Sequence, residues 1–215
     1  MKKYTYCVWD FNGTILDDVD LGIGSINILL REQGLPIISS REEYRSKFDF
    51  PIKDYYTALG FDYDKESYES LAKKWVEIYL GNLKMATLFD DVIEALDFFE
   101  KKGIRQIILS ASESNMLNSQ LDALGIKDRF DEVLGIDNIF ADSKIGIAQK
   151  WRSEHADERV LFIGDTVHDC EAAKVLCADC FVIYSGHQSK ERLSGVGAQL
   201  FPSRKALIRY LEKII

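Results

Sequence analysis

The sequence predicts an α/β protein with a three-layer core, in which helices cover both faces of a parallel sheet, and with a helical cap inserted into that core. Short apolar runs alternate with stretches of helical spacing, the pattern of a parallel sheet buried on both faces. One interval, between residues 10 and 104, breaks the alternation because it has helical spacing and no comparably strong strand-like run. We therefore expect one α/β core and one inserted helical unit.

Six short apolar runs are expected to form the strands of the core. They span residues 4–10, 104–110, 132–135, 160–165, 180–184 and 198–201. Helical spacing occupies residues 90–102, 114–124, 143–155, 169–176 and 203–214. Ser or Asp opens several of these helices, and Gly103 and Gly125 follow two of them, as is typical of helix ends. The first five strands and the four helices between them alternate as βαβαβαβαβ.

The long interval after the first strand is expected to form the helical cap. Helical spacing covers residues 21–33, 41–46, 52–59 and 65–80, with breaks at the Gly and Pro residues of 34–36 and 50–51. The aromatic residues of this interval are Tyr44, Tyr55, Tyr56, Tyr63, Tyr68, Trp75 and Tyr79. Their bulk could cover a site, but aromatic residues at helical spacing more often form the small core of the unit that contains them.

Charge and composition argue against several classes of partner. Lys and Arg number 27 against 35 Asp and Glu, which gives a formal net charge of -8. Because nucleic acids and anionic membranes bind basic surfaces, neither is an expected partner. The N-terminal residues lack the pattern of a signal peptide, and no apolar run approaches the roughly 20 residues of a spanning helix. We therefore expect a cytoplasmic protein.

The cysteines are expected to be structural thiols. Cys177 and Cys180 have the two-residue gap of zinc sites, but no second pair and no nearby histidine pair completes such a site. Cys7, Cys170 and Cys180 lie in or beside apolar segments, where cysteine packs as a small hydrophobe. A metal or redox role is the less favoured alternative.

The first strand ends in residues that suit phosphoryl transfer. In open parallel sheets, reactive groups collect at the carboxyl ends of the strands. Asp10 follows an apolar run, and Gly13 lets the next backbone N–H groups turn toward an anion. Asp10 could attack phosphorus and form an aspartyl phosphate. For this segment alone, an Asx turn that closes the strand is the alternative.

Three further segments add groups that suit a phosphate and a metal ion. Ser110 ends the second strand, where a hydroxyl and backbone N–H groups can bind a phosphoryl oxygen, although serine is also a common helix cap. Lys144 opens a helical stretch, and its ammonium would offset the charges of Asp10 and a phosphate, although most lysines are simply solvated. Asp165 and Asp169 lie where a strand becomes a helix, and such hard oxygen ligands suit magnesium.

Together these segments resemble the haloacid dehalogenase-like hydrolases, in particular the phosphoglycolate phosphatase-like branch with a helical cap. Residues 10–14 resemble the nucleophile motif, Ser110 the hydroxyl motif, Lys144 the lysine motif, and Asp165 with Asp169 the acidic metal motif. All occur in family order, on different strand ends, and the resemblance spans the whole chain.

The resemblance implies both an architecture and a reaction. Residues 1–15 and 88–215 would form a Rossmann-like hydrolase core, and residues 16–87 the cap. The chain would be a magnesium-dependent phosphatase that acts on a small phosphorylated metabolite, such as phosphoglycolate, through an aspartyl-phosphate intermediate. Mg²⁺ would be its cofactor.

The resemblance also assigns roles to individual residues. Asp10 would be the nucleophile and a metal ligand, the backbone carbonyl of Asn12 and the carboxylate of Asp165 would be further ligands, and Asp169 would support the metal site. The residues that would hold the transferred phosphoryl group are Thr14, Ser110, Ala111 and Lys144, with Gly13 contributing only its backbone shape.

Other charged residues are weaker candidates. In the cap, Arg45 and Lys47 precede a segment that resembles the family's substrate loop. They could bind a carboxylate or a second phosphate of the substrate, although charged side chains such as these are more commonly just solvated. His168 is expected to be an exposed residue at a helix start. His155 and His187 give no reason for a catalytic role.

Asn12 departs from the family pattern, because the phosphatases usually have an aspartate there as general acid and base. An amide can perform neither task, and such catalysis is worth roughly 10² to 10⁴ in rate. An aryl or acyl phosphate, whose leaving group needs little protonation, would be affected least. Asn12 could also be an engineered substitution, or the Asn12-Gly13 pair could deamidate slowly and generate aspartate.

Two alternative interpretations follow from the same residues. The first is a catalytically attenuated phosphatase fold that binds a phosphorylated metabolite or a protein partner, which Asn12 supports. The second is a phosphoacceptor signalling domain, which the large helical insert argues against. The acidic pair Asp165 and Asp169 disfavours dehalogenation, because dehalogenases do not require a metal.

Overall fold

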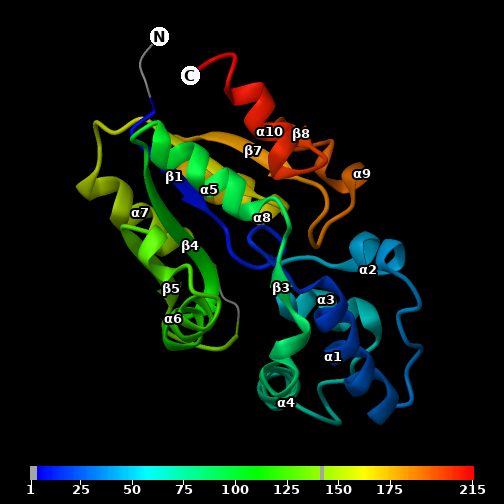
Figure 1. Cartoon of the computed structure of the whole chain (residues 1–215). Coiled ribbons are helices and arrows are strands. Elements are labelled where there is room, and N and C mark those ends of the chain that lie inside the picture. The colour runs from blue at the N-terminus through cyan, green and yellow to red at the C-terminus, as the bar shows by residue number, and fades with distance from the viewer. Residues whose placement is uncertain (1–3, 141–142) are drawn as a thin grey trace.

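The core of the molecule is a parallel sheet in a computed structural model that describes residues 4–140 and 143–215. Its strand order is β5-β4-β1-β6-β7-β8 (Figure 1). The strands are β1 (Tyr6–Trp9), β4 (Arg105–Glu113), β5 (Glu132–Ile136), β6 (Val160–Gly164), β7 (Asp179–Ile183) and β8 (Gln199–Phe201). Because the chain proceeds outward in opposite directions from β1, the topological switch of the sheet lies at β1.

Helices cover both faces of this sheet, because alternate strand residues point to opposite sides. Cys7 and Trp9 pack in one apolar cluster with α5, α6 and α10, whereas Tyr6 and Val8 pack in another with α7 and α8. These helices are α5 (Val92–Lys101), α6 (Ser114–Ala123), α7 (Ile145–Glu154), α8 (Val167–Val175) and α10 (Arg204–Leu211). The prediction of a three-layer α/β core is confirmed.

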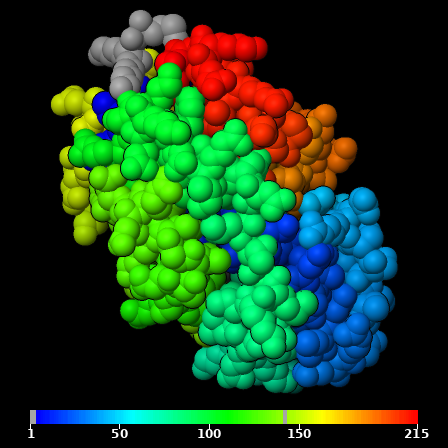
Figure 2. All heavy atoms as spheres, viewed as in Figure 1, coloured from blue at the N-terminus to red at the C-terminus, as the bar shows by residue number. Residues whose placement is uncertain are grey.

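A separate group of helices follows β1 in the chain and lies beside the carboxyl edge of the sheet (Figure 1). It comprises α1 (Val19–Glu32), α2 (Arg41–Lys47), α3 (Ile52–Leu59) and α4 (Tyr68–Gly81). The group has its own apolar cluster, which includes Tyr44, Tyr55, Tyr56 and Tyr68, so these aromatic residues do form a small core. Figure 2 shows the group, in blue to cyan, packed against the rest of the molecule.

Two short antiparallel strands connect the helical group with the sheet. They are β2 (Leu16–Asp17) and β3 (Thr87–Leu88), in which Leu16 pairs with Leu88. The remaining short elements are α9 (Lys190–Leu193) and the 3₁₀ helices η1 (Leu83–Met85) and η2 (Lys127–Arg129). The sequence did not predict these elements, because runs of two to four residues are too short to show a periodic pattern.

The bounds of the longer elements differ from expectation at a few ends. β4 continues to Glu113, past its expected end at residue 110, with an irregular register beyond Leu109. α8 begins at Val167 rather than at residue 169, because the Thr166 side chain caps it. Within the described residues, no helix is both long and apolar enough to cross a membrane.

Candidate active site

Three strand ends meet at one edge of the sheet and carry the candidate residues. β1 lies between β4 and β6 in a register that aligns Trp9 with Ile108 and Ile163. The residues that follow are therefore level with one another, which brings Asp10 and Asp165 together. Both side chains are buried.

Lys144 supplies a positive charge at this edge from the start of α7. Its Nζ lies 2.5 Å from Asp10 Oδ1 and 2.5 Å from Asp169 Oδ1, and it donates to the carbonyl oxygen of Leu109 at 3.1 Å. Burial alone would lower the pKa of Lys144, but the two carboxylates outweigh burial and raise it. Lys144 is therefore a fixed cation that joins the nucleophile candidate to the acidic motif.

Asp169 is held rigidly by the first turn of α8. Its Oδ2 accepts hydrogen bonds from the backbone N–H of Asp165 at 2.9 Å, and from the N–H and hydroxyl of Thr166 at 2.8 and 2.7 Å. A Cβ at Gly164 would lie 2.4 Å from Asp169 Cβ, so only glycine allows this close approach. Burial would raise the pKa of Asp169, but Lys144 and these hydrogen bonds lower it below its usual value.

Asp165 is fixed by contacts from two loops. Its Oδ1 accepts the hydroxyl hydrogen bond of Thr14 at 2.9 Å, and its Oδ2 accepts the backbone N–H of His187 at 2.6 Å. A Cβ at Gly13 or Gly186 would lie only 2.3 or 2.2 Å from Asp165 Oδ2. Burial raises the pKa of Asp165 to about 6, although the charge of His187 acts in the opposite direction.

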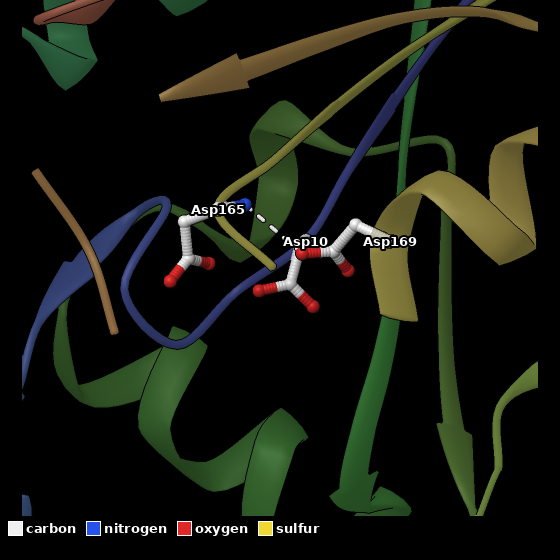
Figure 3. A group of neighbouring side chains, drawn as sticks. All are labelled: Asp10, Asp165 and Asp169. Atoms are coloured by element: carbon white, nitrogen blue, oxygen red, sulfur yellow. Dashed lines mark hydrogen bonds between the residues drawn. The ribbon is translucent and has the colours of Figure 1, made fainter. Parts of the chain in front are cut away.

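Asp10, Asp165 and Asp169 form one buried acidic group (Figure 3). One carboxylate oxygen from each lies within 4.8 Å of the others, with Asp10 between the other two in the view shown. Burial and the charge of Asp169 raise the pKa of Asp10 well above its usual value, despite the opposing effect of Lys144. Hard carboxylate oxygens with one ammonium among them fit a divalent cation, which would supply the missing positive charge.

Asp10, Asp165 and Asp169 are the one group of three or more His, Cys, Asp or Glu side chains with metal-binding spacing among the described residues. The cysteines are free thiols, with Cys170 and Cys180 separated by 3.7 Å between their sulfur atoms. Cys177 is exposed.

The amide of Asn12 is held in one orientation. Its Oδ1 accepts the hydroxyl of Ser112 at 2.8 Å, and its Nδ2 donates to Asp18 Oδ2 at 2.9 Å and to the Tyr79 hydroxyl at 3.0 Å. Asp18 also accepts the backbone N–H of Gly13 at 2.9 Å. The surroundings of residue 12 therefore match an amide, with an acceptor beside its nitrogen and a donor beside its oxygen.

His187 belongs to the site, although no sequence pattern indicated a role for it. Its Nε2 lies 3.1 Å from Asp18 Oδ1, and its Nδ1 lies 3.0 Å from the Tyr44 hydroxyl. Burial would lower the pKa of His187, but Asp18 raises it to about 9, so the imidazole is a buried cation at neutral pH. His187 and Asp18 lie outside the recognised motifs, and no local signal in the sequence marks them.

A cavity of about 160 Å³ opens onto Asp10 between the sheet edge and the inserted helices. Its polar end includes Asp10, Asn12, Ser110, Lys144 and Asp169. The rest is mainly aromatic and aliphatic, with Tyr44, Phe48, Phe50, Tyr55, Tyr56 and Trp75 among its residues. The cavity therefore combines a charged floor with an apolar wall contributed largely by the insertion.

The structure does not place every predicted residue in this cavity. Arg45 donates to the carbonyl oxygens of Gly186 and Ser185, and Lys47 pairs with Glu43, so neither of these two cap side chains lines the cavity. Thr14 is fully buried and donates to Asp165, so its hydroxyl fixes that carboxylate.

The expectation that His168 is exposed is wrong. Its exposed fraction is 7%, and its ring stacks on Phe50 with centroids 4.7 Å apart. The inserted helical group covers the start of α8, which would otherwise be solvated. Burial lowers the pKa of His168 to about 4, so this imidazole is neutral. His155 lies away from the cavity and stacks on Trp151.

The model of a known family matches most of the chain. Residues 7–183 match the family described as haloacid dehalogenase-like hydrolase. The chain belongs to this family. The site motifs at residues 10–14, Ser110, Lys144 and Asp165 all lie within the matched range.

Similar proteins agree with this assignment. A phosphoglycolate phosphatase from Caulobacter vibrioides is 24% identical over 89% of this chain and 84% of its own length. A phosphoglycolate phosphatase from Colwellia psychrerythraea is 30% identical over 63% of this chain and 64% of its own length. A haloacid dehalogenase-like hydrolase from Streptococcus pneumoniae has the same fold, with a TM-score of 0.82, 20% identity, and coverage of 98% of this chain and 100% of that chain. The predicted family, its phosphoglycolate phosphatase-like branch and a phosphatase-type hydrolase are confirmed.

Proposed function

We propose that this haloacid dehalogenase-like hydrolase is a magnesium-dependent phosphatase that cleaves a small phosphate monoester through an aspartyl phosphate on Asp10. The observation that carries the proposal is the position of Asp10. It lines the cavity, its Oδ1 lies 2.5 Å from Lys144 Nζ, and it shares the acidic group with Asp165 and Asp169. A nucleophile, a cation and hard oxygen ligands thus meet where a phosphate can enter.

The acidic group is proposed to hold the metal. Asp10, Asp165 and the backbone carbonyl of Asn12 would be ligands, with Asp169 in support. A bound Mg²⁺ would draw electron density from the phosphoryl oxygens and offset their charge. Lys144 would neutralise the remaining charge, since it already contacts two of the carboxylates.

The residues of the chain would then carry out two displacements. Asp10 forms a bond to phosphorus as the bond from phosphorus to the ester oxygen breaks, while the Ser110 hydroxyl and the Ala111 N–H bind phosphoryl oxygens. The leaving oxygen takes its proton from solvent, because Asn12 has none to give. Water then attacks phosphorus, inorganic phosphate leaves, and Asp10 is regenerated.

The same proposal divides the chain by task. Residues 1–15 and 88–215 would form the catalytic core, and residues 16–87 the cap that selects the substrate, since most of the apolar cavity wall comes from the inserted helices. The names of the relatives make phosphoglycolate one candidate substrate.

The test is hydrolysis of p-nitrophenyl phosphate in Mg²⁺ and in EDTA. We expect release of p-nitrophenol in Mg²⁺, loss of release in EDTA, and recovery on adding Mg²⁺. Asp165→Asn should remove the metal response, whereas the exposed Asp90→Asn should retain it. Equal rates in EDTA and Mg²⁺ would overturn the metal role.

A second candidate is a binding module, favoured by the way Asn12 is held. Its amide has partners on both its nitrogen and its oxygen, so position 12 is well ordered in a form that cannot transfer protons. This candidate predicts that phosphate esters bind in Mg²⁺, as measured by calorimetry, without any turnover.

A further inference from the structure

The apolar wall of the active-site cavity indicates what kind of ester the enzyme cleaves. We propose, on the basis of the phosphatase function above, that the cavity receives an uncharged leaving group with a single aromatic ring, so that the substrate is the phosphate ester of a phenol. The wall is built from rings of the inserted helices, including Phe48, Tyr55, Tyr56 and Trp75. Flat aromatic groups pack against such rings at offset or edge-to-face angles.

The size of the cavity suits one ring. Its volume is about 160 Å³, including the charged floor that would receive the phosphoryl group, so the leaving group can be no larger than about one ring. An apolar protein cavity of roughly 150 Å³ holds one benzene molecule. A ring attached to a phosphoryl group at Asp10 would therefore reach the aromatic wall, whereas glycolate would leave most of that wall without contacts.

The charges around the cavity disfavour a second anionic group. Among the described lining residues, the cations are Lys144, which already contacts Asp10 and Asp169, and His187, which is paired with Asp18. The His168 ring is occupied by its own contacts, since it stacks on Phe50 with centroids 4.7 Å apart and its Nε2 lies 3.2 Å from the Ser143 hydroxyl. A substrate carboxylate would therefore find no cation that is not already paired.

Acidic groups reinforce this preference. Two acidic residues also line the cavity, Glu113 and the Asp18 that pairs with His187. Glu113 accepts the backbone N–H groups of Asn115 and Met116 at the start of α6, so its position is fixed. Burying an anion beside these carboxylates is costly unless a cation pairs with it.

Two residues that line the cavity each have a buried polar atom without a hydrogen-bond partner among the described residues. These atoms are the hydroxyl of Tyr55 and Oε1 of Gln120, on side chains with exposed fractions of 3% and 4%. Buried polar groups normally have partners, so an unpaired hydroxyl and amide oxygen indicate a ligand or water that completes them. Both groups are neutral, which fits a polar but uncharged substituent on the ring.

The chemistry of Asn12 leads to the same substrate class. Asp10 forms its bond to phosphorus as the bond to the aryl oxygen breaks, and the departing phenolate takes a proton from solvent. The hydroxyl pKa of a phenol is about 10, as in tyrosine, whereas that of water is about 15.7. A phenolate therefore leaves without a general acid far more readily than an alkoxide, which offsets the absence of an acid at position 12.

The first experiment compares benzyl phosphate with phosphoglycolate in Mg²⁺. Both esters release an alkoxide-type oxygen, so the comparison separates the effect of an uncharged ring in place of a carboxylate from the reactivity of the leaving group. We expect kcat/KM to be at least about tenfold higher for benzyl phosphate, in line with discrimination by an apolar pocket, and higher again for phenyl phosphate. A higher kcat/KM for phosphoglycolate would overturn the inference.

Acetyl phosphate distinguishes this failure from failure of the phosphatase proposal. It is small and activated, so it needs neither the apolar wall nor a proton donor. Mg²⁺-dependent cleavage of acetyl phosphate with no preference for rings would refute only the aromatic site. Absence of cleavage of acetyl phosphate and of every ester would refute the phosphatase function itself.

The second experiment fills the cavity. Ala72 lines it from α4, so Ala72→Leu should lower kcat/KM for phenyl phosphate by about tenfold or more, through KM, and by less for acetyl phosphate. Ala58→Leu makes the same change at an exposed position of α3 and should leave both substrates unaffected. Equal losses on both substrates in a folded Ala72→Leu protein would contradict a ring site.

Tyr55→Phe tests the polar substituent. Of the three hydroxyphenyl phosphates, with the second hydroxyl ortho, meta or para, at least one should have a higher kcat/KM than phenyl phosphate. That advantage should fall by about fivefold or more in Tyr55→Phe, from the loss of one hydrogen bond. If no isomer has a higher kcat/KM than phenyl phosphate, or if the higher kcat/KM persists in Tyr55→Phe, the Tyr55 hydroxyl does not contact a substituent of the ring.

Discussion

At the scale of single residues, the environment of Asn12 explains how the site accommodates an amide. Asp18 lies 2.9 Å from its nitrogen, and Ser112 donates to its oxygen. An aspartate at position 12 would place a half-buried carboxylate beside the buried carboxylate of Asp18, and such close pairs share one proton. Replacing Asn12 therefore changes the charge state of Asp18 as well as the chemistry of position 12.

Asn12→Asp should supply the missing acid, because the shared proton lies close to the leaving oxygen. The gain in kcat/KM should be about 10² for benzyl phosphate and smaller for phenyl phosphate, whose leaving group needs less protonation. The variant should also lose about 1–3 kcal/mol of stability, which Asp18→Asn should partly restore by again pairing an amide with a carboxylate. Kinetics should use protein checked by mass spectrometry for deamidation. Equal gains on both esters would refute an acid role for position 12.

A substitution at Gly186 gives a second test at the scale of single residues, because the absence of a side chain there leaves room for the Asp165 carboxylate. A Cβ there would lie 2.2 Å from Asp165 Oδ2, so Gly186→Ala must displace the carboxylate. We expect the Mg²⁺ concentration for half-maximal activity to rise about 10- to 100-fold, the usual effect of disturbing a ligand's support. Gly195→Ala, with no atom within 4 Å of its Cβ, is the control. An unchanged Mg²⁺ requirement would show that Asp165 does not hold the metal.

At the scale of secondary-structure elements, the sheet and its helices could be predicted because their apolar periodicity is local. The short strands β2 and β3 could not, since two residues show no period. Asp10, Lys144, Asp165 and Asp169 could be named as candidates because each lies in a recognisable local motif, and the structure brings their side chains together. His187 joins the site only through tertiary contacts with the inserted helical group, and the same packing buries His168, so local sequence could not reveal either environment.

Arg204 links three segments of the chain next to the loop that follows Asp10. From the start of α10 it donates to Asp91 Oδ1 at 2.6 Å, to the carbonyl oxygen of Thr14 at 2.7 Å, and to the Ser185 hydroxyl at 3.1 Å. Because the side chain is buried, Arg204→Leu should leave these partners unpaired and lower the free energy of unfolding by about 3–5 kcal/mol.

The neighbouring pair between Lys205 and Glu94 joins the same two helices at the surface and serves as the control. Lys205→Ala should cost no more than about 1 kcal/mol. Urea denaturation of both variants makes the comparison, and similar losses would show that burial of Arg204 contributes little.

At the scale of the whole molecule, a buried acidic group lies where the sheet meets the inserted helices. The group has three carboxylates, and the ammonium of Lys144 directly contacts two of them, those of Asp10 and Asp169. A divalent cation that binds there stabilises the folded state by mass action. At a cation concentration one hundred times the dissociation constant, the free energy of unfolding rises by about 2.7 kcal/mol. Metal binding should therefore be measurable without turnover.

Thermal unfolding in Mg²⁺ and in EDTA measures this effect. We expect a higher Tm in Mg²⁺ for the wild-type protein, and a much smaller difference for Asp165→Asn, which removes one negative charge from the acidic group. Asp90→Asn, at an exposed position, should keep the full difference. A Tm that does not respond to Mg²⁺ in the wild-type protein would argue against the acidic group as the metal site.

The central claim is that Asp10 accepts the phosphoryl group, and peptide mass spectrometry after acid quenching tests it most directly. The protein is mixed with phenyl phosphate and Mg²⁺, quenched during turnover and digested. The account predicts one added phosphoryl group on the peptide that contains Asp10, at Asp10 itself, and neither the adduct nor turnover in Asp10→Asn. A phosphoryl group on a different residue, or undiminished turnover by Asp10→Asn, would contradict it.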